Sequence, residues 1–120
     1  MSLKKNEELP VIVKWIEFMK WLFQITEKFP KRTRFTFANR IDNLALDTVE
    51  DLIDARYNRN RIEILKRVNL RLEKIRILLR ISKETKILPY KSYESGVKSI
   101  NDVGNMLGGW IKHEENISRR

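Results

Sequence analysis

Apolar residues recur at helical spacing in four segments of the chain and predict four amphipathic helices. In the first segment they occupy positions 11, 12, 15, 16, 18, 19, 22 and 23, and the segment opens at Pro10, a residue suited to the first turn of a helix. It ends near Phe29, because the residue before a proline (here Pro30) is pushed out of the helical region. Residues 1–9 are therefore expected to form an N-terminal tail.

Three further helices follow. The second is expected over about Thr33–Tyr57, the third from the polar break at residues 58–60 to about Lys86, and the fourth over Lys91–Lys112. On the second helix, the apolar side predicted to face inward comprises Phe37, Ala38, Ile41, Leu44, Ala45, Val49, Leu52 and Ile53. On the third, the inward seam comprises Ile62, Leu65, Val68, Leu72, Ile75 and Leu79.

Short connections make neighbouring helices antiparallel. We therefore predict an all-α fold, an up-down-up-down antiparallel four-helix bundle over residues 10–112, followed by a polar C-terminal tail over residues 113–120. Four glycines and three prolines in 120 residues disfavour the many tight turns of a sandwich or barrel. The absence of cysteine excludes disulfides, zinc–thiolate sites and thiol catalysis.

Positive charge is concentrated in residues 56–91, which hold twelve basic and three acidic residues and so account for the whole formal charge of +9. Two rows of cations share faces of the third helix: Arg67, Arg71 and Lys74, and Arg76, Arg80 and Lys83. Phosphate binding, an acidic protein partner and plain solubility are the three interpretations, and the first is favoured. The candidate residues for nucleic-acid or partner binding are Arg56, Arg59, Arg61, Lys66, Arg67, Arg71, Lys74, Arg76, Arg80 and Lys83.

Catalytic and metal-binding patterns are missing from the sequence. The single histidine, His113, lies near the C-terminus, and no Glu-x-x-His motif of a bundle metal site occurs. The acidic row Asp47, Glu50, Asp51 and Asp54 has helical spacing, but it lies opposite the apolar seam and is interpreted as a solvated face. The serines lack a base, and no phosphate-binding loop occurs. We therefore expect no enzyme, no metal and no cofactor.

Two features of the later helices point to packing. The third helix carries more apolar residues than one bundle face needs, namely Ile64, Leu70, Ile77, Leu78 and Ile81, which favours self-association. The glycines at 104, 108 and 109 favour close approach of another helix or a bend. No segment resembles a signal peptide or a membrane span, so a cytoplasmic protein without a membrane partner is expected.

Four sequence blocks, in this order, carry a resemblance to a known family. They are Lys28-Phe29-Pro30-Lys31 with Arg34-Phe35-Thr36-Phe37 and Arg40-Ile41, then the run from Glu50 to Tyr57, then the run from Leu72 to Arg80, and finally Gly104-Asn105-Met106-Leu107-Gly108-Gly109-Trp110. Over about residues 10–112 the chain resembles the accessory variability proteins (the Avd family) of diversity-generating retroelements.

The resemblance implies a small basic four-helix bundle that assembles into a homopentamer. It also implies binding to the reverse transcriptase of the retroelement and to RNA and DNA, in support of mutagenic retrohoming. The family is similar to the four-helix proteins encoded by intervening sequences in 23S ribosomal RNA genes. The alternative is therefore a protein of that type, or a generic oligomeric helical adaptor, without a polymerase partner.

Overall fold

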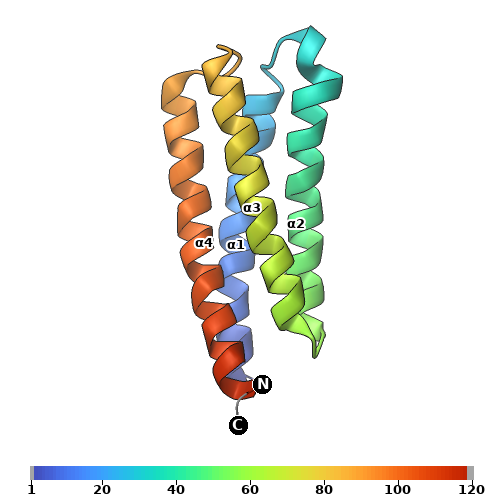
Figure 1. Cartoon of the computed structure of the whole chain (residues 1–120), viewed down its shortest axis with the longest axis vertical. Coiled ribbons are helices and arrows are strands. Elements are labelled where there is room, and N and C mark those ends of the chain that lie inside the picture. Colours follow the sequence, from blue (N-terminus) through green and yellow to red (C-terminus); the bar gives the residue numbers. More distant parts are fainter. Residues whose placement is uncertain (1, 119–120) are drawn as a thin grey trace.

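The computed structural model describes the backbone of residues 2–118 and the side chains of residues 10–118. Four α-helices make up almost all of it, with one 3-10 turn (η1) and one turn of π-helix (η2) between the first two. Their bounds are α1 Ser2–Thr26, η1 Lys31–Thr33, η2 Arg34–Ala38, α2 Asn39–Tyr57, α3 Arg61–Glu84 and α4 Tyr90–Ser118 (Figure 1).

The helices form the predicted up-down-up-down bundle. In order around the bundle, α1 packs on α2, α2 on α3, α3 on α4, and α4 on α1. The chain measures 51 × 22 × 20 Å along its principal axes. The α1–α2 and α3–α4 connections lie at one end of the bundle, and the α2–α3 connection lies at the other end with both termini (Figure 1).

The core follows the apolar spacing closely. On α3, the seam residues Leu65, Val68, Leu72, Ile75 and Leu79 are all fully buried. A buried hydrogen bond joins the first two helices, since the indole Nε1 of Trp15 donates to the carbonyl oxygen of Ala45 at 3.0 Å.

Some residues predicted to face inward are exposed instead: Ile16 and Phe23 on α1, and Ile53 on α2. Conversely Ile64, counted among the surplus apolar residues of α3, is buried. A helix in a four-helix bundle buries only one stripe of its surface. The apolar residues of α1 and α2 extend beyond that stripe, so those at its edge remain in solvent.

Both predicted tail boundaries differ from the structure. Helix α1 begins at Ser2, so Pro10 lies inside it rather than in its first turn. The preceding residues are mostly Leu, Lys and Glu, which favour helix. Residue 1 lies outside the described residues, as do the side chains of residues 2–9.

At the other terminus, α4 continues to Ser118, and a polar tail from His113 is wrong over residues 113–118. The reason is a tertiary contact, because Glu114 is buried and pairs with Arg61 at the start of α3. Residues 119–120 lie outside the described residues.

The glycines of α4 have unequal roles. Gly96, which the sequence pattern did not single out, is the crowded one: a Cβ there would lie 2.7 Å from Cη2 of Trp21. At Gly104 a Cβ would lie 3.2 Å from the guanidinium of Arg76, whereas Gly108 and Gly109 face open space. The prediction of close packing within this chain is therefore correct for Gly104 and wrong for Gly108 and Gly109.

The connection between α3 and α4 begins two residues earlier than predicted. Lys86 has a φ of 64°, the only positive φ at a non-glycine residue in the described chain. The amides of Ile87 and Leu88 both donate to the carbonyl oxygen of Ser82, at 2.8 and 3.0 Å, and so satisfy the end of the helix. No helix of the described chain is long and apolar enough to cross a membrane.

Candidate basic interface

The first predicted row of cations faces α2, where its two arginines share one carboxylate. Arg71 donates from Nη1 to Asp51 Oδ2 at 2.8 Å, and Arg67 donates from Nε to the same oxygen at 3.2 Å. Burial alone would raise the pKa of Asp51, but the hydrogen bonds from Arg67 and Arg71 outweigh it and lower that pKa. The same hydrogen bonds raise the pKa of Arg67.

The prediction that Asp51 belongs to a solvated acidic row is therefore wrong. Its side chain is only 15% exposed and lies against α3. Asp47, Glu50 and Asp54 are exposed, as the pattern predicted. The position of Asp51 on α2 brings it to the contact between α2 and α3. There it neutralises arginine charge that the sequence pattern predicts to be available to a ligand.

The second row of cations faces α4 and is also engaged. Arg76 donates to Asn101 Oδ1 and to Glu73 Oε1, both at 3.0 Å. Arg80 donates to Glu84 Oε2 at 3.0 Å, and this interaction lowers the pKa of Glu84.

Lys83 completes the row through aromatic contacts. Its ammonium lies 4.6 Å from the ring centroid of Tyr93 and 5.9 Å from that of Tyr90. Attraction to the two rings orients this cation toward α4.

The remaining candidates lie at or near the terminal end of the bundle. Arg61 and Glu114 form a buried ion pair with 3.7 Å between Nε and Oε1, and Lys66 pairs with Glu115 at the same separation on the surface. Arg56 lies 5.5 Å from the ring centroid of Tyr57. Arg61 is therefore a structural residue rather than a surface cation.

The ten candidates consequently do not form one surface. They divide between the α2 flank of α3, the α4 flank of α3 and the terminal end. Only Arg59 and Lys74 make no hydrogen bond, ion pair or ring contact within the described residues. Most of the predicted basic patch is paired inside the chain.

A second group of cations was not predicted from the sequence. Residues 28–40 hold five basic residues and no acidic one, a higher charge density than in residues 56–91. Averaging this segment with the acidic part of α2 concealed it, and a sliding window of about a dozen residues would have found it. The five are Lys28, Lys31, Arg32, Arg34 and Arg40.

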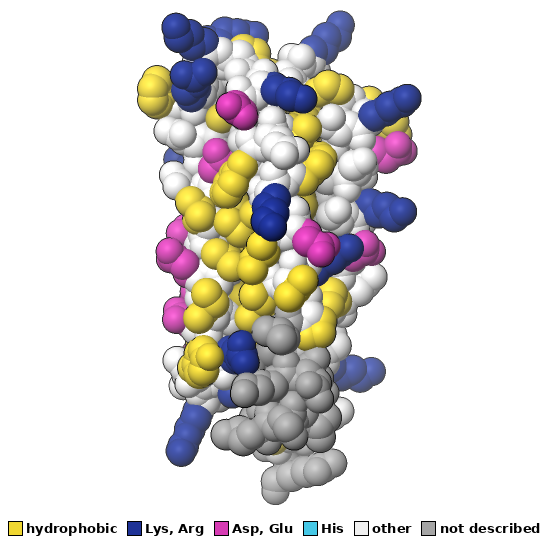
Figure 2. Space-filling view, turned by 180° about the vertical axis from the view of Figure 1, so that it is seen from behind, with side chains coloured by type: hydrophobic (Ala, Val, Ile, Leu, Met, Phe, Trp, Pro, Cys, Tyr) yellow, Lys and Arg dark blue, Asp and Glu magenta, His cyan; other side chains and the backbone are white. Residues whose placement is uncertain are grey.

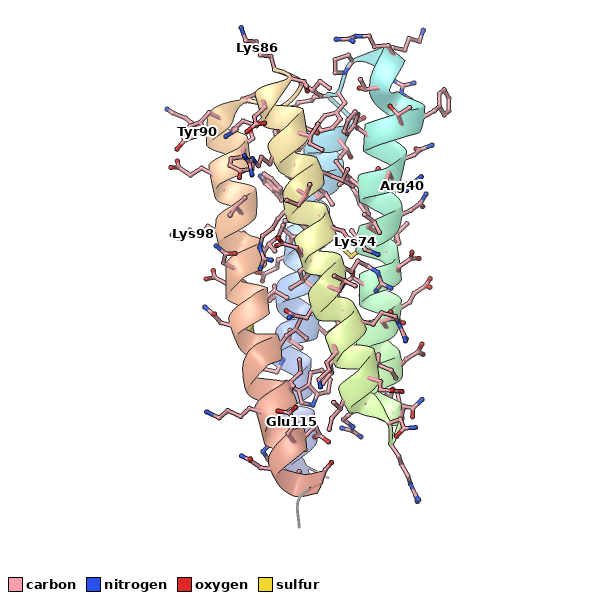
Figure 3. All side chains as sticks on the ribbon, viewed as in Figure 1. Arg40, Lys74, Lys86, Tyr90, Lys98 and Glu115 are labelled. Carbon is pink, nitrogen blue, oxygen red and sulfur yellow. The ribbon has the colours of Figure 1, made fainter. Side chains whose placement is uncertain are left out.

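The fold brings most of these cations to the loop end of the bundle with those of the α3–α4 connection. We call this group the cationic end: Lys28, Lys31, Arg32, Arg34, Lys86 and Lys91. All six are exposed, and none makes a side-chain hydrogen bond or ion pair within the described part of the chain. Lys and Arg side chains gather at the upper end of the molecule in Figure 2, and Figure 3 shows Lys86 projecting from the same end.

Between α2 and α3 the surface is hollowed. A hollow of about 450 Å³ is lined by Arg40, Leu44, Lys74 and Ile77, among others. Lys74 lies at the seam between the two helices (Figure 3). Its lining also includes the carboxylate of Glu73 and the apolar side chain of Leu78, so apolar groups and charges of both signs meet in this hollow.

The described residues contain no group of three or more His, Asp or Glu side chains placed so that they could hold a metal ion. Asp42 has a raised pKa, because burial outweighs the hydrogen bond it accepts from Thr26 Oγ1 at 2.9 Å. This carboxylate faces the α1–α2 contact rather than a cleft and is structural.

Comparison with known proteins agrees with the fold and the sequence blocks. No curated protein sequence matches the chain significantly. A family model described as bAvd-like matches residues 10–114, which is most of the chain and includes all of α2 and α3 and most of α1 and α4. The chain therefore belongs to the bAvd-like family, the family of accessory variability determinants that its sequence blocks resemble.

Proposed function

We propose that this chain is a non-catalytic accessory protein of a diversity-generating retroelement that binds a reverse transcriptase together with RNA and DNA. The observation that carries the proposal is the family match over residues 10–114. The formal charge of +9 supports the nucleic-acid part, because a cationic surface attracts phosphates and releases their counterions whatever the base sequence.

The cationic end and the cations of α3 are the two places where phosphates would bind. The cationic end is the better candidate, since its side chains would not have to break an ion pair with a described carboxylate in order to bind a phosphate. A phosphate reaching Arg67 or Arg71 competes with Asp51 and is repelled by it. We therefore assign nucleic-acid binding first to the cationic end, with Arg59 and Lys74 as further contacts.

Salt titration of RNA and duplex DNA binding tests this assignment. Two double variants remove the same net charge: Arg32→Gln with Arg34→Gln at the cationic end, and Arg76→Gln with Arg80→Gln on α3. We expect the first pair to reduce the log–log salt slope by about 1.4–1.8, because each phosphate that is no longer neutralised removes about 0.7–0.9, and the second pair to reduce it less. Equal reductions would show that net charge alone governs binding, and no binding by the unaltered chain at low salt would refute the nucleic-acid part.

Reverse-transcriptase binding is tested by co-purification. A tagged reverse transcriptase encoded beside the gene for this chain should retain it through a salt wash and nuclease treatment. Retention that disappears with nuclease would mean that the polymerase is reached only through nucleic acid. Absence of a neighbouring reverse-transcriptase gene and of a template/variable repeat pair would favour the alternative of a 23S intervening-sequence type or generic helical adaptor.

We also propose that the protein self-associates and acts in the cytoplasm. Val13, Ile16 and Phe23 on α1 and Leu46 and Ile53 on α2 leave apolar area in solvent. Apolar side chains form a band along the face where α1 lies (Figure 2). Burial of such a band between copies is favourable in proportion to its area. A pentamer is the number that the family resemblance implies, and light scattering giving only the 14.4 kDa monomer at micromolar concentrations would refute self-association.

A further inference from the structure

One aromatic side chain beside the cationic end stands in solvent without a partner in the described part of this chain. Phe35 is 82% exposed, the highest value among the large apolar side chains described. It lies on η2, the turn of π-helix that leads into α2. Covering the faces of a phenyl ring is favourable, so a ring that is held in solvent is available to a ligand.

The backbone beneath Phe35 is fixed rather than loose. Thr33 is buried, and its hydroxyl donates to the carbonyl oxygen of Pro30 at 2.8 Å. The hydroxyl of Thr36 donates to the carbonyl oxygen of Thr33 at 3.3 Å, and Ala38 is buried in the core. The ring is therefore presented from a defined position, which lowers the entropy cost when a ligand covers it.

A hollow lies beside the ring. It has a volume of about 320 Å³ and is lined by Phe35, Thr36, Phe37, Arg40 and Leu78. It shares Arg40 and Leu78 with the larger hollow between α2 and α3, which also carries Lys74. An apolar face, one hydroxyl and a guanidinium thus converge on a shallow space.

Three arginines lie within five positions of the ring along the chain. Arg32, Arg34 and Arg40 are exposed and make no hydrogen bond or ion pair within the described residues. A guanidinium presents a planar fork of donors that matches a phosphate in bidentate geometry. The ligand that fits must combine an anionic chain with flat apolar faces.

We propose that Phe35 is a stacking platform for an unpaired base of single-stranded RNA or DNA, with Arg32, Arg34 and Arg40 holding the flanking phosphates. A single strand offers both features at once, whereas the base faces of a duplex are covered by their neighbours. Stacking on an aromatic ring tolerates every base, because each has a π-face. This inference rests on the proposed nucleic-acid function and assigns it a strand preference.

Binding of a short fluorescent oligothymidylate and of a duplex of equal length, at moderate salt, tests the proposal. Phe35→Ala should weaken single-strand binding by about 5- to 150-fold, the usual effect of removing one aromatic ring on which a base stacks, and leave duplex binding within about twofold. Phe35→Trp should retain or strengthen single-strand binding. Tyr57→Ala is the matched control, since Tyr57 is 77% exposed at the opposite end of α2 and should change neither affinity.

A second readout follows the stacking itself. An oligonucleotide containing 2-aminopurine should lose fluorescence on binding the unaltered chain, because stacking quenches this base, and should lose much less with Phe35→Ala. Equal reductions of single-strand and duplex affinity, or no change in either, would overturn the stacking role while leaving general nucleic-acid binding in place. Absence of binding to any nucleic acid would overturn both. Dissociation of the oligomer by Phe35→Ala would assign the ring to a contact between copies and overturn the proposal.

Discussion

The buried pair between Arg61 and Glu114 gives the sharpest test of how this bundle is held together. The residues are 8% and 6% exposed and join the start of α3 to the last turns of α4. The Nε of Arg61 also donates to the carbonyl oxygen of Asn58 at 3.1 Å, which fixes the guanidinium in the α2–α3 connection. Truncating Glu114 to alanine removes the carboxylate that pairs with this buried guanidinium.

The expected cost of Glu114→Ala is about 3–5 kcal/mol, the usual penalty for breaking a buried pair by removing one partner. Unfolding entropies near 2.1 cal/mol/K per residue give about 0.25 kcal/mol/K for a chain of this size, so the melting temperature should fall by about 12–20 °C. Replacing both partners, as in Arg61→Met with Glu114→Leu, should recover most of this stability, since apolar groups of similar volume often substitute for such a pair.

Glu115 supplies the matched control, because it lies one residue along α4 and pairs with Lys66 on the surface. In Figure 3, Glu115 lies near the terminal end of the bundle, on the side of α4 toward α3. Glu115→Ala should cost about 0–1 kcal/mol. Thermal unfolding followed by circular dichroism measures all three variants. Equal melting temperatures for Glu114→Ala and Glu115→Ala would refute the reasoning, and so would a double variant no more stable than Glu114→Ala.

Four further variants test local features by thermal or denaturant unfolding. Lys86→Gly should stabilise the fold by about 1 kcal/mol, since glycine adopts a φ of 64° without the Cβ penalty. Asp51→Asn should cost about 1.5–3 kcal/mol at neutral pH; because folding lowers the pKa of Asp51, that contribution is present above its ordinary value of 3.8 and disappears as the pH falls below it. Gly96→Ala should destabilise by about 1–3 kcal/mol through its clash with Trp21, whereas Gly109→Ala, in open space, should stabilise by about 1 kcal/mol.

The fold could be predicted from the sequence because its main determinant is local. Apolar spacing alone predicts the four helices, and five of the six predicted seam residues of α3 are fully buried, while Ile62 is half-buried. The helix ends were less accurate, because they depend on tertiary contacts. The pattern around His113 is polar, and only the pairing of Glu114 with a residue more than fifty positions away explains why α4 continues.

The candidate site could be predicted only in part for the same reason. A sequence gives the number of charges on a helix face, but which carboxylate lies opposite depends on how two helices pack. Asp51 was assigned to solvent from its own helix, yet the position of α3 turns it into the partner of two arginines. The exposure of Phe35 also follows from packing, since Phe37 two residues later lies partly in the core.

Ion pairs inside the chain affect how much of the formal charge of +9 is available to attract a polyanion at each place on the surface. An arginine that already donates to a carboxylate brings a negative charge to the same place, so the cluster of Arg67, Arg71 and Asp51 offers a net charge of +1 from two cations. The cationic end offers each of its charges in full, because no carboxylate in the described chain is bound to them. Association with a polyanion is guided by the field of unneutralised charge, which is greatest where such side chains gather on one protruding end. The α3 arginines thus contribute mainly to holding α2, α3 and α4 together, while the helix connections carry the charge that a partner meets first.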